Sequence, residues 1–360
     1  MKILALTKYT YSGASSRYRF YNYKECFKKS GINLLIEPFF FNSYLLSSRL
    51  AKAPIVIFSY IKRFFLLFTI LIFKNRYKII LIEYELFPYF PPIFEYFLKR
   101  RGIKYIVDYD DAIFHKYDSS KNIFIKLLFK NKIARVMSYA SSVVVCNEYL
   151  EDYAKKYNHN TLRLPTVVLL DKYKEAMIDF KKDNSTFTIG WIGSKSTSKY
   201  IVEILPVMQK FSNKHRDVEF NLVGFDETIC LNKNINVIQW EEETEIKNIL
   251  NFDVGIMPLD NSLWSRGKCA FKLVQYMSCK KPVIASPVGM NCTIVNNNIN
   301  GFLVNSEDEW FQAFEELYKN KLLREEMGNN NYMKIKSNFN YGENCIKYII
   351  LIKNIGSSKL

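Results

Sequence analysis

The chain of 360 residues is long enough for two domains of ordinary size, and its composition, 49% hydrophobic and 24% charged, excludes a disordered protein. Basic residues outnumber acidic ones by 51 to 35, and residues 1–100 alone hold 16 basic and 5 acidic side chains. Either the first half binds an anionic partner, a phospholipid surface or a nucleic acid, or the excess consists of ordinary solvated lysines.

Cysteine and histidine usage predicts no zinc site. The seven cysteines are scattered without Cys-x-x-Cys spacing, and the three histidines lie far apart in the sequence. A reducing cytoplasm fits this odd-numbered set best. The first ten residues, MKILALTKYT, are expected to form a strand, because they lack the apolar length and the cleavage site of a signal peptide.

The first half alternates short apolar runs with helical patterns. Amphipathic helices are expected over 16–30, 91–101 and 148–156, and glycines follow the first two. The strands expected here are 3–6, 32–36, 79–82, 105–107, 143–145 and 162–164.

Residues 55–73, IVIFSYIKRFFLLFTILIF, form the most apolar segment. Lys62 and Arg63 interrupt it, and the ten residues that follow are too few to span a bilayer, which needs about 20. Two alternatives remain. The segment is a buried helix packed on a sheet, or it lies in a membrane interface with nearby cations reaching the headgroups. Those cations are Lys62, Arg63, Lys74, Arg76 and Lys78.

The alternating pattern restarts after a polar stretch at 172–186, which is expected to be a linker or a surface helix. Alternating strands and helices in both halves predict two doubly wound α/β domains, 1–171 and 187–337, whose strand ends can line a cleft for two ligands. Residues 338–360 are expected to form a C-terminal helix that could return to the first domain. The strands expected in the second half are 188–191, 219–223, 236–238, 254–257 and 283–285.

The stretch 253–291 combines a strand, a loop, a helix and a second strand. Arg266 and Lys268 flank Gly267 in the loop, and Lys272 follows at the start of the helix. Ligands of doubly wound sheets bind at the carboxyl ends of the strands, and cations there favour a diphosphate. The alternative is that Lys268 and Lys272, four residues apart, occupy a solvated helix face.

Two further strand-to-helix turns suit phosphate binding. In the second half, Gly193, Ser194 and Thr197 can cap a helix and contact a phosphate with the same groups. In the first half, the turn holds Gly13, Ser15 and Ser16, followed by Arg17 and Arg19, which could bind an acceptor diphosphate or simply line the helix.

Acidic residues end a strand in the first half, at Asp108, Asp110 and Asp111. Three carboxylates so close together repel one another and therefore need partners or a role. A sugar contact or acid/base role is one reading, and local capping and lysine pairing is the other. Glu85, after the strand at 79–82, could also reach the cleft.

Several segments together resemble a known family. They are GASSRYR (13–19), DYDDAIF (108–114), CNEYLEDYA (146–154), LPTVV (164–168), IGWIGSKST (189–197), DVGIMPL (253–259), the run from Arg266 to Gly289, and NGFLV (300–304). They resemble the retaining nucleotide-sugar glycosyltransferases of family four, in a bacterial branch that builds cell-surface glycans. The resemblance covers nearly the whole chain and implies the GT-B fold, two Rossmann-like domains facing across a cleft.

The chain departs from this family at two positions. Most members carry two glutamates eight residues apart, one at the donor sugar and one at the ribose, where this chain has Gly267 and Gln275. Gln275 could bond a ribose hydroxyl without charge. Related enzymes often place a histidine against the donor sugar, where this chain has Asp110 or Asp111, with His115 four residues later.

The resemblance implies a glycosyltransferase that moves a sugar from a nucleoside diphosphate to a glycan or lipid-linked acceptor, without a metal or other cofactor. The basic first domain is expected to face an anionic membrane surface on the cytoplasmic side of the inner membrane, and no nucleic-acid partner is expected. Loss of the glutamate pair leaves a non-catalytic nucleotide-sugar-binding or scaffolding protein as the alternative. A nucleotide-sugar epimerase on the same fold fits less well, because the Gly267–Lys272 run lacks the carboxylate such enzymes use.

Overall fold

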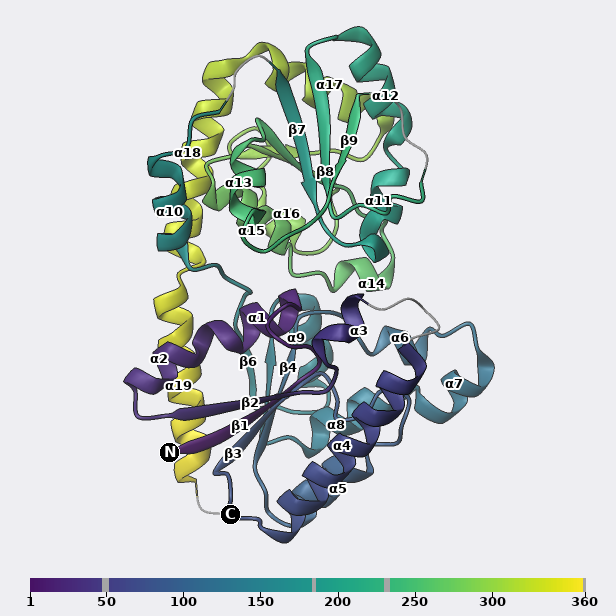
Figure 1. The fold of residues 1–360 in the computed structure, drawn as a ribbon, viewed down its shortest axis with the longest axis vertical. Coiled ribbons are helices and arrows are strands. Elements are labelled where there is room, and N and C mark those ends of the chain that lie inside the picture. The colour runs from purple at the N-terminus through teal and green to yellow at the C-terminus, as the bar shows by residue number, and fades with distance from the viewer. Residues whose placement is uncertain (47–51, 183–185, 230–233, 359–360) are drawn as a thin grey trace. The chain divides into compact units, whose positions relative to one another are not determined.

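The computed structural model describes residues 1–46, 52–182, 186–229 and 234–358. These residues form two compact units (Figure 1). The first unit comprises Met1–Thr166, Gly267–Cys269 and Gly342–Leu360, and the second comprises Val167–Arg266 and Ala270–Tyr341. The chain passes between units at Thr166–Val167, a few residues before the expected boundary, and the expected linker overlaps a helix of the second unit.

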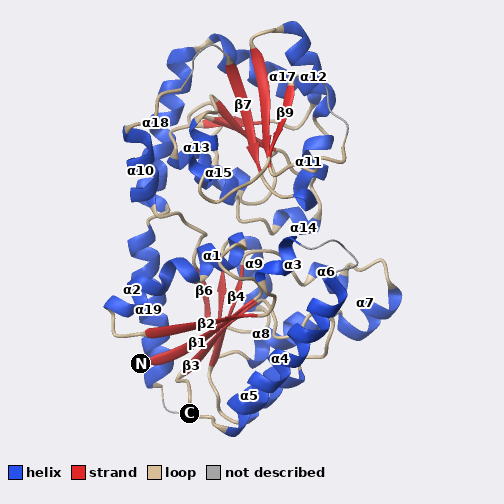
Figure 2. Ribbon diagram, viewed as in Figure 1, coloured by secondary structure: helices blue, strands red, loops and turns tan. Residues whose placement is uncertain are grey.

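The first unit is built on a six-stranded parallel sheet with helices on both sides (Figure 2). Its strands are apolar runs buried on both faces, as parallel sheets covered by helices require; every residue of Ile79–Glu83 is buried. The strands are β1 (Lys2–Thr7), β2 (Asn33–Pro38), β3 (Ile79–Glu83), β4 (Tyr105–Tyr109), β5 (Ser142–Val145) and β6 (Thr161–Arg163).

Helices of the first unit follow the sequence pattern with one main difference. The single helix expected over 16–30 is broken at Phe20, whose φ of −130° is not helical, into two short helices and a 3₁₀ turn, η1 (Tyr21–Tyr23). The helices are α1 (Ala14–Arg19), α2 (Lys24–Lys29), α3 (Asn42–Leu46), α4 (Lys52–Ile72), α5 (Ile93–Arg100), α6 (His115–Asp118), α7 (Ile123–Phe129), α8 (Lys132–Tyr139), α9 (Glu148–Lys155) and the C-terminal α19 (Tyr341–Ser357).

The C-terminal helix α19 packs within the first unit. Tyr348 is buried, and its ring centroid lies 5.7 Å from that of Tyr23 and 5.4 Å from that of Phe27. Cys345 is paired with Cys26 of α2, with their Cα atoms 6.5 Å apart. Spacing could not suggest this pairing, because 319 residues separate the two cysteines.

The second unit repeats the architecture with a second six-stranded parallel sheet (Figure 2). Its core is rich in aromatic side chains, with Trp191, Phe211 and Phe220 fully buried. The strands are β7 (Phe187–Ile192), β8 (Val218–Val223), β9 (Ile235–Ile238), β10 (Val254–Met257), β11 (Val283–Ala285) and β12 (Gly301–Leu303).

The second unit has a short 3₁₀ turn and two helices between its first two strands. The turn, η2 (Lys195–Thr197), follows β7, and the second of the two helices has a proline in its first turn. The helices are α10 (Leu170–Ile178), α11 (Ser198–Val202), α12 (Leu205–Lys214), α13 (Glu245–Leu250), α14 (Leu263–Arg266), α15 (Phe271–Ser278), α16 (Asn291–Ile294), α17 (Glu307–Lys319) and α18 (Lys321–Asn338).

Strand order locates one binding edge in each unit. The first sheet runs β2-β1-β3-β4-β5-β6, and the second runs β12-β11-β10-β7-β8-β9. The direction of winding reverses between β1 and β3 in the first sheet and between β7 and β10 in the second. Ligands of open α/β sheets bind outside the carboxyl ends of the strands at such reversals. The predicted fold class, two doubly wound α/β domains, is therefore confirmed.

The apolar segment around residues 55–73 is α4, and it is not a core helix. Only Ser59, Arg63, Leu67 and Ile70 are buried along its 21 residues. By length and composition α4 is apolar enough to cross a membrane, although core helices pass the same test. The alternative of a buried helix is wrong, because the large side chains of the opposite face are exposed.

Candidate functional site

Hydrogen bonds within the turn after β7 fix its conformation. Thr197 Oγ1 accepts from the Ser194 backbone N–H at 3.1 Å and donates to the Ser194 carbonyl at 2.9 Å. This capping arrangement fixes the start of η2 and leaves the Ser194 side chain exposed. Gly193 is required there, because a Cβ atom would lie 2.2 Å from the Trp191 ring.

The loop after β10 is built around a carboxylate. Asp260 accepts from Ser262 Oγ at 2.6 Å and also from Ser265 Oγ. Burial alone would raise the pKa of Asp260, but these hydroxyl donors hold it below its usual value. The loop is therefore preorganised with a negative charge at its base.

Two contacts join this loop to the helix after β7. Tyr200 and Ser265 share a buried hydrogen bond of 3.0 Å, and Lys199 Nζ lies 3.6 Å from Asp260. The loops after the two strands at the reversal point thus form one corner of the second unit, which we call the donor corner and define by Gly193–Thr197 and Asp260–Arg266.

Arg266 is an exposed cation of the donor corner, as is Lys195. Its Nε donates to Asn261 Oδ1 at 3.0 Å, and in the described part of the chain no hydrogen bond engages its Nη atoms. The loop after β11 closes against its backbone at Gly289, which has a φ of +53° and where a Cβ would lie 2.6 Å from the Arg266 carbonyl oxygen. A guanidinium anchored in this way can bind phosphate oxygens in bidentate fashion.

Lys272 and Gln275 lie on α15. Lys272 Nζ is 5.3 Å from the centroid of the Trp191 ring. Gln275 is buried, and its Nε2 donates to Glu245 Oε1 at 2.8 Å, while Trp240 donates to the other oxygen of the same carboxylate at 2.9 Å. The neutral amide therefore complements a buried carboxylate of α13.

Lys268 groups with the first unit, whereas Arg266 groups with the second. Gly267–Cys269 group with the first unit, and there Lys268 Nζ forms an ion pair of 3.0 Å with Asp111 Oδ1. Burial raises the pKa of Asp111, and Lys268 opposes that rise. The sequence alternative for this aspartate is pairing with a local lysine, whereas its partner in the structure, Lys268, is 157 residues away along the chain.

The reversal point of the first unit is occupied by Glu83, at the end of β3. Its Oε2 accepts from Ser16 Oγ at 2.6 Å and from the Lys8 backbone N–H at 2.7 Å. Among the described residues, its buried Oε1 has no hydrogen-bond partner. Burial raises the pKa of Glu83 to about 7, although both donors act in the opposite direction.

Tyr84 extends this cluster to the predicted aspartates. It has a φ of +63°, a strained conformation for a tyrosine, and its hydroxyl donates to Asp110 Oδ1 and lies 3.4 Å from Ser15 Oγ. Ser15, Ser16 and Asp110, predicted from separate motifs, are thus brought together through Glu83 and Tyr84. Gly13 is the N-cap of α1 beside them.

Other predicted residues of the first unit have internal partners. Arg19 binds Asp108 with two hydrogen bonds of 2.8 Å and donates to the Leu164 carbonyl at 2.7 Å. The buried guanidinium of Arg17 lies 4.9 Å from the centroid of the Tyr18 ring.

His115 and Glu85 are also engaged. The ring nitrogens of His115 lie 2.9 Å from Asp118 Oδ1 and 2.7 Å from the Tyr149 hydroxyl. Glu85 forms a buried ion pair with Lys132 and accepts from the Tyr117 hydroxyl at 2.7 and 2.8 Å. Across residues 1–46, 52–182, 186–229 and 234–358, no three His, Cys, Asp or Glu side chains converge in a way that could hold a metal ion.

Glu83 and Tyr84 were missed from the sequence, although a signal for Glu83 existed. It directly follows an apolar strand, as Glu85 does two residues later, and the first carboxylate after a strand is the one at the sheet's carboxyl edge. The positive φ of Tyr84 leaves no such trace, since glycine and asparagine are the residues expected at φ > 0.

A known protein family matches part of the chain. Residues 173–334 match the family described as "Glycosyl transferases group 1". Apart from Gly267–Cys269, the matched residues belong to the second unit. The matched residues contain the whole donor corner. Among curated proteins, none matches this sequence.

Solved structures show the same fold over the full chain. Sucrose-phosphate synthase from Thermosynechococcus elongatus is similar with a TM-score of 0.69 and 13% identity, covering 100% of each chain. A glycosyltransferase from Rickettsia africae gives 0.69 and 16%, covering 99% of each. HepE from Anabaena, solved in complex with UDP-glucose, gives 0.66 and 12%, covering 98% of this chain and 100% of its own.

Proposed function

We propose that this protein transfers a sugar from a nucleoside diphosphate sugar to a cell-surface glycan or lipid-linked acceptor, with retention of anomeric configuration. The observation that carries the proposal is the donor corner, which lies at the reversal point of the second sheet inside the residues that match group 1 glycosyltransferases. HepE, similar in fold, was solved with UDP-glucose, which supports a nucleotide sugar as the donor.

The chemistry expected of the donor corner is stabilisation of the leaving group. Glycosyl transfer develops negative charge on the departing diphosphate, and preorganised donors lower the barrier by binding that charge. Arg266 supplies a bidentate cation, and the Gly193–Thr197 turn supplies an exposed hydroxyl and backbone amides. The negative Asp260 orients the loop through Ser262 and Ser265, so that it acts as a positioning residue.

The acceptor is proposed to bind at the reversal point of the first unit. Gly13, Ser15 and Ser16 would approach its hydroxyl or phosphate groups, with Asp110 and Tyr84 beside them. The protein would act in the cytoplasm at the inner membrane face, where lipid-linked acceptors are available, and would need no metal.

Nucleotide binding tests the donor corner directly. UDP, GDP and their common sugar conjugates are titrated against the protein, and binding is followed by the rise in unfolding temperature, because a ligand of the folded state stabilises it by RT ln(1 + [L]/Kd). At least one nucleotide is expected to bind. Arg266→Ala should weaken that binding about tenfold or more, since hydrogen bonds to charged groups are worth about 1.5–3 kcal/mol.

Arg216→Ala is the matched control. Arg216 is also exposed and basic, but it lies two residues before β8, at the amino end of the same sheet, so its loss should leave nucleotide affinity unchanged. The proposed donor site is rejected if no nucleotide binds, or if Arg266→Ala and Arg216→Ala behave alike.

A non-catalytic role is the second candidate, motivated by Gly267 and by the internal hydrogen bond of Gln275. Slow hydrolysis of the bound sugar nucleotide, measured as release of free sugar, distinguishes the two. Hydrolysis that falls in Arg266→Ala supports the transferase. Tight binding without turnover of any donor, with or without acceptor glycans, supports the binding or scaffolding protein.

A further inference from the structure

The helix α4 presents a continuous apolar stripe to solvent. Its exposed side chains recur every three or four residues, singly or as adjacent pairs, which places them on one face of a helix, opposite the buried Ser59, Arg63, Leu67 and Ile70. Monomeric soluble proteins seldom leave so large a contiguous apolar face uncovered. The stripe consists of Ile57, Phe58, Ile61, Phe64, Phe65, Phe68 and Ile72, each 48–63% exposed.

The stripe continues onto α5 through aromatic contacts. The Phe64 and Phe94 rings meet edge to face, 5.5 Å apart, and Ile93, Tyr96 and Phe97 of α5 are themselves 42–46% exposed. We call the α4 stripe together with these three residues the apolar face. Figure 1 shows α7 on the same side of the first unit, and four of its apolar side chains, Ile123, Phe124, Leu127 and Leu128, are 59–74% exposed.

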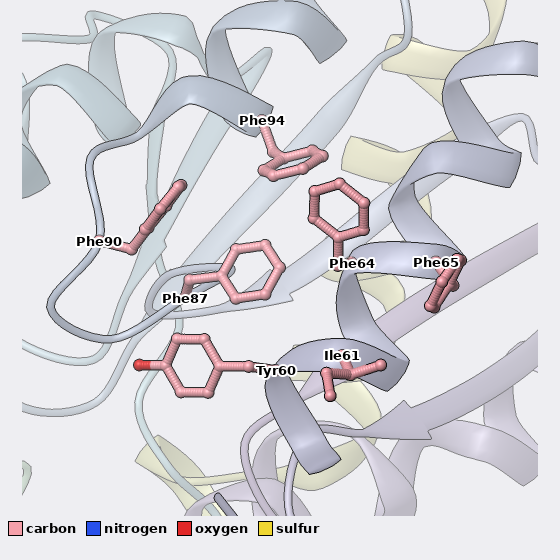
Figure 3. Close-up of a pocket in the computed structure, with 7 residues that line it drawn as sticks. All are labelled: Tyr60, Ile61, Phe64, Phe65, Phe87, Phe90 and Phe94. Carbon is pink, nitrogen blue, oxygen red and sulfur yellow. The ribbon is translucent and has the colours of Figure 1, made fainter. Parts of the chain in front are cut away.

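A cavity of about 270 Å³ opens between α4 and the segment that leads into α5. It is lined by Tyr60, Ile61, Phe64, Phe65, Phe87, Phe90 and Phe94 (Figure 3). The single polar group of this lining, the Tyr60 hydroxyl, donates to the Pro88 carbonyl and points away from Phe64 and Phe94 in Figure 3. Sugars and nucleotides need polar partners, so the cavity suits a hydrocarbon chain.

Cations border the apolar face, and none of its residues is an aspartate or glutamate; the nearby Glu37, whose side chain is 47% exposed, lies 3.7 Å from Lys62 of α4. Residues 38–82 contain seven lysines and arginines and no aspartate or glutamate. Exposed Lys74, Arg76 and Lys78 follow α4, and exposed Lys99 and Arg100 end α5. The two ends adjoin, since Arg101 donates to the Leu71 carbonyl at 3.0 Å. Apolar area beside net positive charge complements an anionic bilayer, whose headgroups attract each nearby lysine or arginine by about 1 kcal/mol.

The same evidence argues against a second copy of the chain as the occupant. In a symmetric dimer this face would meet itself, and among the described residues its cations outnumber the one nearby carboxylate, Glu37, which already pairs with Lys62, so most of them would lack an ionic partner. It also argues against a spanning helix. Arg63, in the middle of α4, is buried and donates to the backbone carbonyls of Thr7 and Glu37, which fixes the helix to the first sheet.

We propose that the apolar face lies on an anionic lipid bilayer, with the aromatic side chains of α4 and α5 among the acyl chains and one lipid tail entering the cavity. Of the cations expected to reach the headgroups, Arg63 is excluded by burial, and Lys62 is half-buried and donates to the Pro38 carbonyl. Lys74, Arg76 and Lys78 keep that role. The inference deepens the proposed function by defining how the enzyme reaches lipid-linked acceptors.

Sedimentation with vesicles tests the proposal without donor or acceptor, so its result is independent of transferase activity. The wild-type protein should co-sediment with vesicles of phosphatidylcholine and phosphatidylglycerol at low salt, and less with phosphatidylcholine alone. The variant F58S/F65S/F68S, which adds no charge, should bind the anionic vesicles at least tenfold more weakly. K74Q/R76Q/K78Q should lose the preference for anionic vesicles.

The control I178S/L322S/M333S removes three apolar side chains of the second unit that are 60–78% exposed, and it should bind like the wild type. Unchanged unfolding temperatures verify that each variant is folded. Insertion is measured with the variant F65W. Vesicles with brominated acyl chains should quench a larger share of its tryptophan fluorescence than of the wild-type fluorescence. The four tryptophans of the wild type all belong to the second unit.

Three results would overturn the proposal. The first is no sedimentation of the wild type with anionic vesicles at low salt. The second is equal binding by F58S/F65S/F68S and the control. The third is a wild-type dimer in solution that F58S/F65S/F68S dissociates while vesicle binding is absent, which would assign the face to a second copy of the chain.

Discussion

Ser16 Oγ donates a hydrogen bond of 2.6 Å to Glu83 Oε2, which joins the helix after β1 to the end of β3 across 67 residues of sequence. Both side chains are buried, and the carboxyl group lies at the reversal point of the first sheet. Burial raises the pKa of this carboxyl from its ordinary 4.5 to about 7, so near neutral pH it changes charge inside the proposed acceptor site.

This shift makes the stability of the first unit depend on pH. A raised carboxyl pKa means that the folded state holds its proton more tightly than the unfolded state, so stability is highest below about 4.5 and falls as the pH rises toward 7. Glu83→Gln removes the titration. Its free energy of unfolding relative to the wild type should increase by roughly 2–3 kcal/mol between pH 5 and pH 8.

Denaturant unfolding at the two pH values measures this difference. The control is Glu37→Gln, which removes a carboxyl that is 47% exposed on β2. A pH-independent difference for Glu83→Gln would show that Glu83 titrates at an ordinary pKa in the folded protein.

Fold and strand positions could be predicted because buried parallel strands are short apolar runs between turn residues. The strands expected at 254–257 and 283–285 match β10 and β11 residue for residue. The Ser16–Glu83 pair could not be predicted, since it depends on which strands are neighbours, and hydrophobic periodicity does not specify strand order.

The apolar segment at 55–73 shows a second feature that the sequence alone could not predict. Its composition fits a core helix and an interfacial helix equally well, and burial alone separates them. Arg63, which was assigned to the headgroups, is buried because two backbone carbonyls at the end of the first sheet accept its hydrogen bonds. The donor-binding roles of Arg266, Lys272 and Gln275 stay predictions.

The buried pair of Arg19 and Asp108 is expected to be structural. Both side chains are about 2–3% exposed and meet in a bidentate arrangement. Asp108→Asn leaves the guanidinium buried without its counter-charge and should destabilise the protein by about 3–5 kcal/mol, as measured by thermal unfolding. Arg19→Met combined with Asp108→Leu should recover much of the loss, since both charges are then removed.

An exposed pair in the same unit provides the comparison. Arg163 lies 2.7 Å from Glu151 with its side chain 47% exposed, so Arg163→Gln should cost no more than about 1 kcal/mol. If Asp108→Asn destabilises the protein no more than Arg163→Gln does, Arg19 does not depend on Asp108. That outcome would favour the prediction that Arg19 binds an acceptor diphosphate.

We predict that a negative charge at position 275 destabilises the protein. Its amide donates to the buried Glu245 at 2.8 Å, and Gln275→Glu would replace that donor by a second carboxylate. Two buried carboxylates side by side repel each other, so the variant should be destabilised by roughly 3 kcal/mol at pH 8 and by less at pH 5. Gln312→Glu, on an exposed position of α17, is the charge-matched control. Equal stability of Gln275→Glu and the control at pH 8 would mean that Gln275 is turned away from Glu245.

The place of α19 can be tested by removing one ring. Tyr348 is 1% exposed and packs against Tyr23 and Phe27 of the first unit. Tyr348→Ala should therefore cost about 3–5 kcal/mol, since large aromatic-to-alanine changes in a core leave a cavity. Ile350→Ala, on the same helix but 52% exposed, should cost less than about 1 kcal/mol. Hydrogen exchange locates the effect: amides of β1 and β2 should lose protection in Tyr348→Ala, while those of β7 and β8 keep theirs. Loss of protection in the second unit instead would mean that α19 stabilises that unit rather than the first.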